Sequence, residues 1–267
     1  ENKGQFDNVL PKNQTVKYAY ANGDEQVYFT TTGVTYLLQK HFPLTHHKLE
    51  QMEHGKNIIR KPSLKCFVNV TWENANDNIE IIESEEQSYY HSFGEEQFKS
   101  KCYKKITYKN VYNNIDIEYL FTNERDNGIK YNVVLHPGAN IKDVKIKYTG
   151  DIEEVRLKNN TVVIKTKILD VEELSPVSYQ NNLRLETQYE LNNNVISFNI
   201  PNGYDTNKQL VIDPWVTNLA LTVNNCALDV DYDASGNYFV YGGSNPFKVA
   251  KYSNTGVLVW TFNGVVV

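Results

Sequence analysis

The feature that most constrains the fold is a period of two in the apolar residues, which recurs along nearly the whole chain. Apolar and polar residues alternate in segments such as CFVNVTW (66–72) and NVISFNI (194–200), with turn signals such as Asn159-Asn160 between segments. This alternation is typical of strands with one buried face. Because strands recur about every 8–12 residues with no long helical pattern between them, the sequence predicts an all-β protein of antiparallel sheets, sandwich-like or barrel-like.

The pattern changes near Pro214, which follows the apolar residues VID. A proline tends to stand at a strand end because it cannot donate to a ladder. Beyond it, ALDVDYDASGNYFVYGG (227–243) and FKVAKYSNTGVLVWTFNG (247–264) each indicate two strands around a tight turn. Four short antiparallel strands are the size of one propeller blade. The sequence therefore predicts a sandwich-like N-terminal domain, residues 1–213, and the first blade of a β-propeller, residues 214–267, with further repeats after it.

Charge and hydropathy argue against nucleic acid as a partner and against a membrane-spanning segment. The 267 residues carry a net charge of −5, which provides no general attraction for phosphate, so nucleic acid is not an expected partner. No apolar run approaches the roughly 20 residues of a membrane helix, so no membrane-spanning segment is expected. The first residues have neither the basic nor the apolar region of a signal peptide, as in a mature chain.

Asp116 and Glu118 form a pair that raises the question of catalysis. Residues i and i+2 of a strand point the same way about 6.6 Å apart, and the acid and base of an inverting glycosidase lie roughly 6.5–9.5 Å apart. The surrounding alternation, however, is also what a sheet with one solvated face produces. The sequence favours structural carboxylates, solvated or hydrogen-bonded, over glycosidase chemistry.

A first hypothetical metal site lies in a histidine-rich segment without strand alternation, residues 41–62. If part of it is helical, His47, Glu50 and His54 share one face and could bind zinc. The HExxH spacing is absent, and imidazoles on a polar loop need no metal. A solvated loop is the favoured interpretation.

A second hypothetical metal site is DVDYDASGN, where Asp229, Asp231 and Asp233 alternate before a glycine, as in part of a calcium loop. Position twelve of such a loop should be acidic, and counted from Asp229 it is Val240. A blade turn already explains the glycine. No cofactor is expected, with calcium kept as the weaker alternative.

The three cysteines, Cys66, Cys102 and Cys226, have no CxxC pairing. A disulfide between Cys66 and Cys102 is one hypothesis for an exported protein. The favoured hypothesis is that the three cysteines are isolated thiols.

Common catalytic and nucleotide-binding motifs, GxSxG, GxGxxG and GxxxxGK[ST], are absent, so the sequence does not predict an enzyme. Exposed tyrosines and Trp260 could instead form a contact surface for carbohydrate or protein, although packing in the sheet core is the favoured explanation for such aromatic residues.

Several segments together resemble a known family. They match, in order, an N-terminal β-rich domain of unknown function that precedes β-propeller repeats in exported surface proteins of Bacteroidota, many of them substrates of the type IX secretion system. The resemblance covers essentially the whole chain and rests on ENKGQF, VYFTTTGVTYLL, SYYHSFG, ITYKNVYNNIDIEYLF, IKYNVVLHPGANIKDVKIKYTG, VVIKT, SPVSYQ, VISFNI, YDTNKQLVIDP and DASGNYFVYGG.

The resemblance implies export and a cell-surface location, and it carries no catalytic residues. The expected function is that of a non-enzymatic secreted protein acting in adhesion, gliding motility or surface assembly. Its expected partners are other surface proteins or the outer-membrane translocon of the secretion system, with carbohydrate as a further candidate. The alternative is an accessory region of a secreted polysaccharide-degrading hydrolase.

Overall fold

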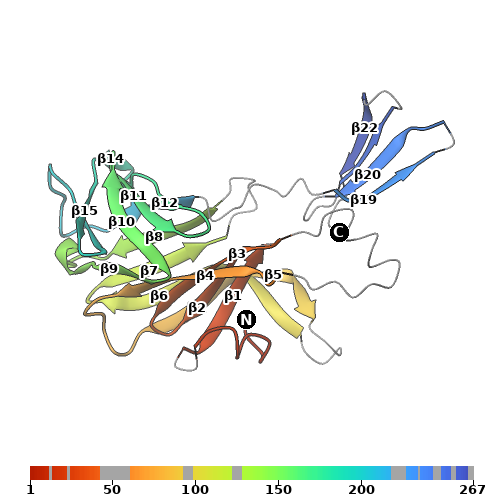
Figure 1. Ribbon diagram of the computed structural model, residues 1–267. Helices are drawn as coiled ribbons and strands as arrows, with labels where there is room; N and C mark the ends of the chain where they lie inside the picture. Colours follow the sequence, from red (N-terminus) through yellow and green to blue (C-terminus); the bar gives the residue numbers. More distant parts are fainter. Residues whose placement is uncertain are drawn as a thin grey trace. The chain divides into compact units, whose positions relative to one another are not determined.

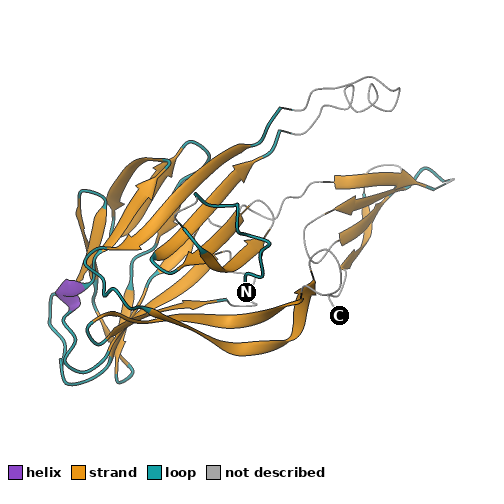
Figure 2. Cartoon of the chain, turned by 90° about the horizontal axis from the view of Figure 1, so that it is seen from below, coloured by secondary structure: helices purple, strands orange, loops and turns teal. Residues whose placement is uncertain are grey.

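The structure is a computed structural model, and the regular secondary structure of its described residues is almost entirely β-strand (Figure 1). Contacts between Cα atoms divide the chain into two compact units, Glu1–Leu219 and Ala220–Val267. Every strand pair in the described residues is antiparallel, and their helical structure is a single 3₁₀ turn, η1 (Ile141–Asp143), drawn in purple in Figure 2. The predicted all-β antiparallel class is confirmed. The described residues are 1–11, 14–22, 25–42, 61–92, 99–121, 128–217, 227–233, 235–242, 248–253 and 257–263.

The first unit contains a seven-stranded sheet, whose neighbouring strands are mostly consecutive in the chain. Its strands pack closely enough that Gly33, at the start of β3, approaches the backbone of β4. In spatial order the strands are β1 (Val16–Asn22), β2 (Glu25–Thr30), β3 (Gly33–Lys40), β4 (Leu64–Trp72), β9 (Ile146–Gly150), β16 (Val195–Asn199) and β15 (Gln188–Asn192).

An eleven-stranded sheet completes the first unit. The first four strands below are neighbours in chain order, and β8 then pairs with both β17 and β18. The strands are β5 (Glu80–Ser92), β6 (Lys99–Tyr112), β7 (Ile115–Leu120), β8 (Gly128–Leu135), β17 (Leu210–Asp213), β13 (Val177–Gln180), β14 (Leu183–Leu185), β18 (Trp215–Thr217), β12 (Val171–Glu173), β11 (Thr161–Thr166) and β10 (Ile152–Lys158).

The main hydrophobic core contains buried residues of both sheets, an arrangement compatible with a β-sandwich. Large tyrosines fill it: Tyr36 and Tyr148 come from the seven-stranded sheet, and Tyr108, Tyr119 and Tyr131 from the eleven-stranded one. Each is at most 2 % exposed. The period-two pattern thus arises because one face of each strand contributes to this shared core.

A smaller core lies on the other face of the seven-stranded sheet, where the N-terminal segment packs against it. Leu10, Val16, Tyr28 and Leu37 are buried there, with the ring of Phe6 5.7 Å from that of Tyr28. This contact holds residues 1–11 close to β1 and β2.

Pairs of asparagines close three of the hairpins. Asn159 and Asn160 both have positive φ, at 49° and 58°, and connect Lys158 to Thr161 across the β10–β11 hairpin. Two-residue hairpin loops need positive φ at both positions, and asparagine accepts this conformation readily. The turn predicted there is confirmed, and Asn181-Asn182 and Asn193-Asn194 form further turns of the same kind.

Pro214 lies between β17 and β18, which pair in succession with the same strand, β8. The predicted domain boundary, between residues 213 and 214, therefore precedes a strand that still belongs to the first unit. A proline can interrupt a strand without ending its domain, because the ladder with the neighbouring strand resumes after it.

The second unit is a four-stranded antiparallel sheet in the order β19 (Ala227–Tyr232), β20 (Tyr238–Gly242), β21 (Lys248–Tyr252) and β22 (Leu258–Asn263). Gly236, with φ of 75°, lies in the turn predicted between β19 and β20. The four predicted strands are present. Whether they form a propeller blade stays a prediction.

Candidate functional site

Asp116 lies on β7 as predicted, but it is buried rather than solvated. It is 3 % exposed, and its Oδ2 is 2.6 Å from Lys109 Nζ and 2.8 Å from His136 Nε2. Its Oδ1 accepts a hydrogen bond from the Asn110 amide at 2.8 Å. A register irregularity in β6 and the positive φ of Asn110, 51°, accompany this contact. Of the two structural alternatives, the hydrogen-bonded carboxylate is confirmed for Asp116 and the solvated one is wrong.

The charge of this carboxylate is stabilised by its partners. Burial alone would raise the pKa of Asp116, but hydrogen bonds from His136, Lys109 and the Asn110 amide outweigh it and lower the pKa. A glycosidase general acid needs the opposite, a raised pKa. Glu118, half-buried on the same strand, forms its own ion pair with Lys105. The geometry thus gives both carboxylates structural partners.

We expect Asp116→Ala to lower the free energy of unfolding by about 2 kcal/mol, because the Asn110 amide, Lys109 and His136 lose their shared acceptor. Lys109 and His136 are partly exposed and can regain water, which limits the loss. The matched variant Glu118→Ala should cost less than about 1 kcal/mol, as a partly exposed ion pair does. Urea denaturation measures both, and equal losses would contradict the different roles assigned to the two carboxylates.

The residues of the first hypothetical metal site, His47, Glu50 and His54, lie outside the described residues. Among the residues that the structure does describe, no group of three or more histidine, cysteine or carboxylate side chains is placed to hold a metal ion.

Of the three aspartates of the second unit, Asp229 has a described backbone but no described side chain. Asp231 is exposed, and its Oδ1 accepts from the Tyr232 amide at 2.8 Å. Asp233 binds the turn itself: it accepts hydrogen bonds from the amides of Ser235 and Asn237, each at 3.0 Å. Hydrogen bonds from the Asn237 side chain and backbone are the main reason that the pKa of Asp233 is lowered.

Cys66 and Cys102 both carry free thiols, so the hypothetical disulfide is not formed. Cys66 lies on β4 of the seven-stranded sheet and Cys102 on β6 of the eleven-stranded sheet, so the two are not on neighbouring strands. The Cys66 thiol donates to the Asp151 carbonyl at 3.0 Å. Cys226 lies outside the described residues.

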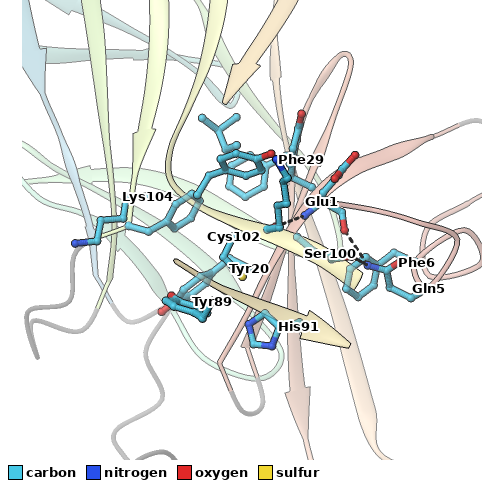
Figure 3. Close-up of a pocket in the computed structure, with 16 residues that line it drawn as sticks. Glu1, Gln5, Phe6, Tyr20, Phe29, Tyr89, His91, Ser100, Cys102 and Lys104 are labelled. Carbon is cyan, nitrogen blue, oxygen red and sulfur yellow. Dashed lines mark hydrogen bonds between the residues drawn. The ribbon is translucent and has the colours of Figure 1, made fainter. Parts of the chain in front are cut away.

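The first unit contains a pocket of about 430 Å³ that sequence reasoning did not identify. Figure 3 shows side chains reaching it from well-separated segments: Glu1, Gln5 and Phe6 from the N-terminal segment, and Tyr89 and His91 from β5. β1 and β6 supply further walls. Pockets of about 300–1,000 Å³ lined mainly by apolar and aromatic groups are typical of small-molecule sites. This pocket is the candidate functional site.

Seven of the sixteen residues that line this pocket are tyrosines or phenylalanines. The ring of Tyr20 stacks on that of Phe121, with centroids 5.3 Å apart and planes 18° apart. Tyr18 meets Tyr103 edge to face at 6.3 Å. Tyr89, 57 % exposed, is the most accessible aromatic residue of the pocket. The rings thus give the pocket broad, rigid apolar surfaces with polar edges.

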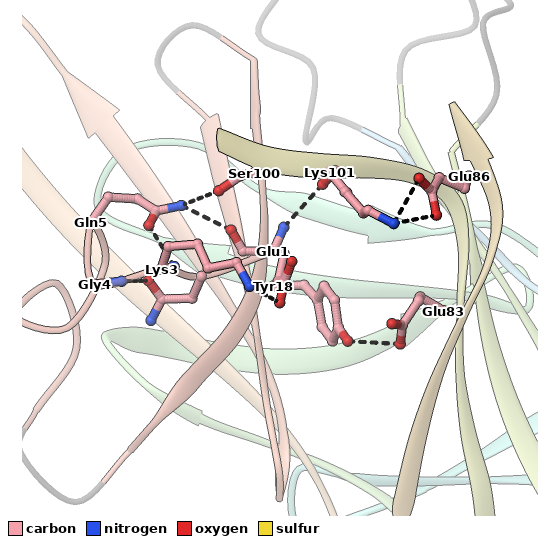
Figure 4. A network of polar contacts seen from close by, with 10 residues as sticks. Glu1, Lys3, Gly4, Gln5, Tyr18, Glu83, Glu86, Ser100 and Lys101 are labelled. Carbon is pink, nitrogen blue, oxygen red and sulfur yellow. Dashed lines mark hydrogen bonds and ion pairs between the residues drawn. The ribbon is translucent and has the colours of Figure 1, made fainter. Parts of the chain in front are cut away.

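Polar contacts fix the N-terminal wall (Figure 4). The Gln5 side-chain amide donates to the Glu1 carbonyl at 2.8 Å and to Ser100 Oγ, on β6, at 3.2 Å. Across the pocket region, the Tyr18 hydroxyl donates to Glu83 on β5 at 2.8 Å and so links the two sheets. The walls are therefore preorganised by hydrogen bonds between segments far apart in the sequence.

Three charged residues line the pocket: Glu1, Lys101 and Lys104. The Glu1 carboxylate pairs with Lys3 at 2.5 Å, and the N-terminal ammonium donates to the Lys101 carbonyl at 3.5 Å. Lys101 pairs with Glu86 at 3.0 Å, and Lys104 extends its ammonium group away from the other labelled side chains (Figure 3). Burial raises the pKa of the Tyr18 hydroxyl, aided by its bond to Glu83, and burial also raises the pKa of the Cys102 thiol. The Tyr18 hydroxyl and the Cys102 thiol are therefore neutral at physiological pH.

A second unusual group lies in the core rather than in the pocket. Glu173, on β12, is 1 % exposed, and the hydroxyls of Tyr131 and Tyr148 donate to its two carboxylate oxygens. Burial raises its pKa to about 7, although these hydrogen bonds oppose the shift. Tyr131 and Tyr148 come from different sheets, so Glu173 joins the two through tyrosine hydroxyls.

One signal in the sequence could have indicated the pocket. Tyr18 and Tyr20 alternate in VKYAYA and so share one face of β1, and both line the pocket. The sequence does not show, however, that β5, β6 and the N-terminal segment face them.

Two further sequence predictions, on membrane-spanning segments and on Trp260, concern parts of the chain outside the pocket. Within the described residues, no helix has the length and apolar character needed to cross a membrane. Trp260, a candidate for a contact surface on sequence grounds, is 41 % exposed in the second unit, where its ring lies 6.1 Å from that of Phe239.

Comparison with protein families gives one match. The family model described as "Domain of unknown function (DUF7948)" matches residues 1–215. No curated protein and no solved structure matches the chain. The matched segment ends within β18, close to the end of the first unit.

Proposed function

The chain belongs to the DUF7948 family, a family of domains of unknown function, and on that premise we propose that it is a non-enzymatic, secreted protein of the bacterial cell surface. Its first unit is a sandwich-like binding module. Its second unit is the first blade of a β-propeller. The protein acts in adhesion, gliding motility or surface assembly, as cargo of the type IX secretion system, and contacts other surface proteins or the outer-membrane translocon.

The observation that carries this proposal is the aromatic pocket of the first unit. Its walls contain rigid rings, buried hydroxyl groups and an amide, which recognise a ligand by shape and hydrogen bonding. The carboxylates that first suggested catalysis, Asp116 and Glu118, are not among its lining residues and are engaged in structural contacts. Binding is therefore the activity that the geometry supports best.

The second unit supports the proposal through its sheet order. A four-stranded antiparallel meander is the unit from which propellers are built. Its last strand, β22, exposes apolar side chains, with Val259 at 55 % and Phe262 at 53 %. In a propeller the faces of each blade pack against neighbouring blades, which gives such side chains partners.

The proposal predicts that the protein is accessible from outside the cell. Antibodies raised against residues 1–215 should label intact cells of the producing bacterium, and labelling should be lost when the translocon is inactivated. A periplasmic protein of the same cells, labelled only after permeabilisation, serves as the control. Labelling of the family domain only after permeabilisation would contradict a surface location.

The alternative, an accessory region of a polysaccharide hydrolase, makes a different prediction for the full-length natural protein. That protein should then release new reducing ends from a polysaccharide to which it binds. We expect binding without cleavage.

A further inference from the structure

We propose that the pocket between β1, β5, β6 and the N-terminal segment binds one pyranose unit of a neutral glycan. The proposal rests on the binding function proposed above and names its ligand class. Three properties of the pocket lead to it: the kind of aromatic residue in the walls, the placement of hydrogen-bonding groups, and the distribution of charge.

The kind of aromatic residue is the first property. A pyranose ring has an apolar face of C–H groups and an edge of hydroxyls, so it needs flat aromatic surfaces bordered by polar groups. Tyrosine provides both, and tyrosines outnumber phenylalanines in the walls. The four tyrosines are Tyr18, Tyr20, Tyr89 and Tyr103.

The hydrogen-bonding groups are the second property. Ser100, 3 % exposed, accepts from the Gln5 amide, and a hydroxyl that accepts still has its own O–H to donate. The imidazole of His91 stands beside the ring of Tyr89, with centroids 6.2 Å apart (Figure 3). Sugar hydroxyls both donate and accept, so a buried hydroxyl such as that of Ser100 matches them.

Charge is the third property. The Lys101 ammonium pairs with Glu86, and the Lys104 ammonium points away from the labelled groups of the pocket. The Glu1 carboxylate pairs with Lys3, and the N-terminal ammonium donates to the Lys101 carbonyl. An anionic ligand such as a phosphate or a uronic acid would need a cation directed at it. The volume of about 430 Å³ is near the lower end of the range for ligand pockets, which suits a mono- or disaccharide unit.

Tyr89 and Tyr90 provide a matched pair for the test. They are adjacent on β5 and similarly exposed, at 57 % and 52 %. Tyr89 lines the pocket, whereas Tyr90 does not line it and lies under the ammonium of Lys99 at 4.6 Å. Since successive strand residues point to opposite faces, only the change at Tyr89 removes a wall of the pocket.

The experiment uses the whole chain and the methyl glycosides of glucose, galactose, mannose and N-acetylglucosamine. Saturation-transfer NMR detects binding, and the alkylation rate of Cys102, which lines the pocket, locates it. Buried Cys66 is the internal control. We expect at least one glycoside to bind and to protect Cys102. Tyr89→Ala should weaken binding about tenfold, as expected for loss of an aromatic contact, whereas Tyr89→Phe and Tyr90→Ala should retain most of it.

Three results would overturn the proposal. The first is that none of the glycosides binds. The second is equal binding by Tyr89→Ala and Tyr90→Ala, which would place the sugar elsewhere. The third is protection of Cys102 by octanoate but by no sugar, which would assign the pocket to aliphatic ligands. Because surface labelling of intact cells needs no sugar, the surface function stands or fails separately.

Discussion

A Glu173→Gln variant is expected to remove a large pH dependence from the stability of the first unit. The carboxylate of Glu173 has a raised pKa of about 7 in the folded protein, against an ordinary value of 4.5. Between these values the folded protein holds a proton that the unfolded chain has released. The stability from this group is therefore fully present below pH 4.5 and is lost as the pH rises through about 7.

The expected size of the effect is about 3 kcal/mol, because each tenfold change in proton affinity corresponds to about 1.4 kcal/mol. Urea denaturation between about pH 4.5 and 8 should show the stability of the wild type falling by that amount relative to Glu173→Gln. Glu190→Gln, at an exposed position of β15, is the control and should run parallel to the wild type. Parallel profiles for Glu173→Gln and the wild type would show that Glu173 is not protonated in the core.

A Gly150→Ala variant should destabilise the first unit by about 4 kcal/mol. Gly150 ends β9 with φ of +98°, and an added Cβ would lie 2.3 Å from the Phe67 carbonyl oxygen. The chain passes here from the seven-stranded to the eleven-stranded sheet. Asp151 fixes the crossing, because its amide donates to the Phe67 carbonyl and its carboxylate accepts from the Phe67 amide. The neighbouring backbone therefore cannot move away without breaking these bonds.

Gly203→Ala separates the cost of the positive φ from the cost of the clash with the Phe67 carbonyl. Gly203 also has positive φ, +71°, but no atom outside its own stretch of chain lies within 4 Å of the place that an added Cβ would occupy. The variant should lose only about 1 kcal/mol of its free energy of unfolding, from the strain of a positive φ in alanine. Thermal and urea denaturation of both variants measure the difference. Similar losses for the two would mean that the contact with Phe67 is relieved by relaxation of β4.

Local chemistry made much of the fold predictable. Asparagine pairs such as Asn159-Asn160 indicate tight hairpins because few other residues accept positive φ at both positions. Alternation likewise indicates which residues of β7 share a face with Ile115 and Ile117, both fully buried. These signals depend only on neighbours in the sequence, so they can be interpreted without knowledge of the tertiary structure.

Burial of the other face and the pocket could not be predicted in this way. Alternation places Asp116 opposite the apolar residues of β7, but its burial depends on His136 and on an irregularity in β6. The pocket depends on contacts such as Gln5 with Ser100, 95 residues apart. The extent of the first unit also depends on pairing over long distances, because β18 joins β8 and β12 after a proline that locally resembles a boundary.

The placement of β18 has a mechanical consequence for the adhesive role proposed above. The second unit follows β18 in the chain, so tension applied through it pulls first on this strand. β18 is bonded to β8 on one side and to β12 on the other. Such a load is therefore shared by two hydrogen-bonded ladders in the interior of a sheet, instead of peeling away one edge strand.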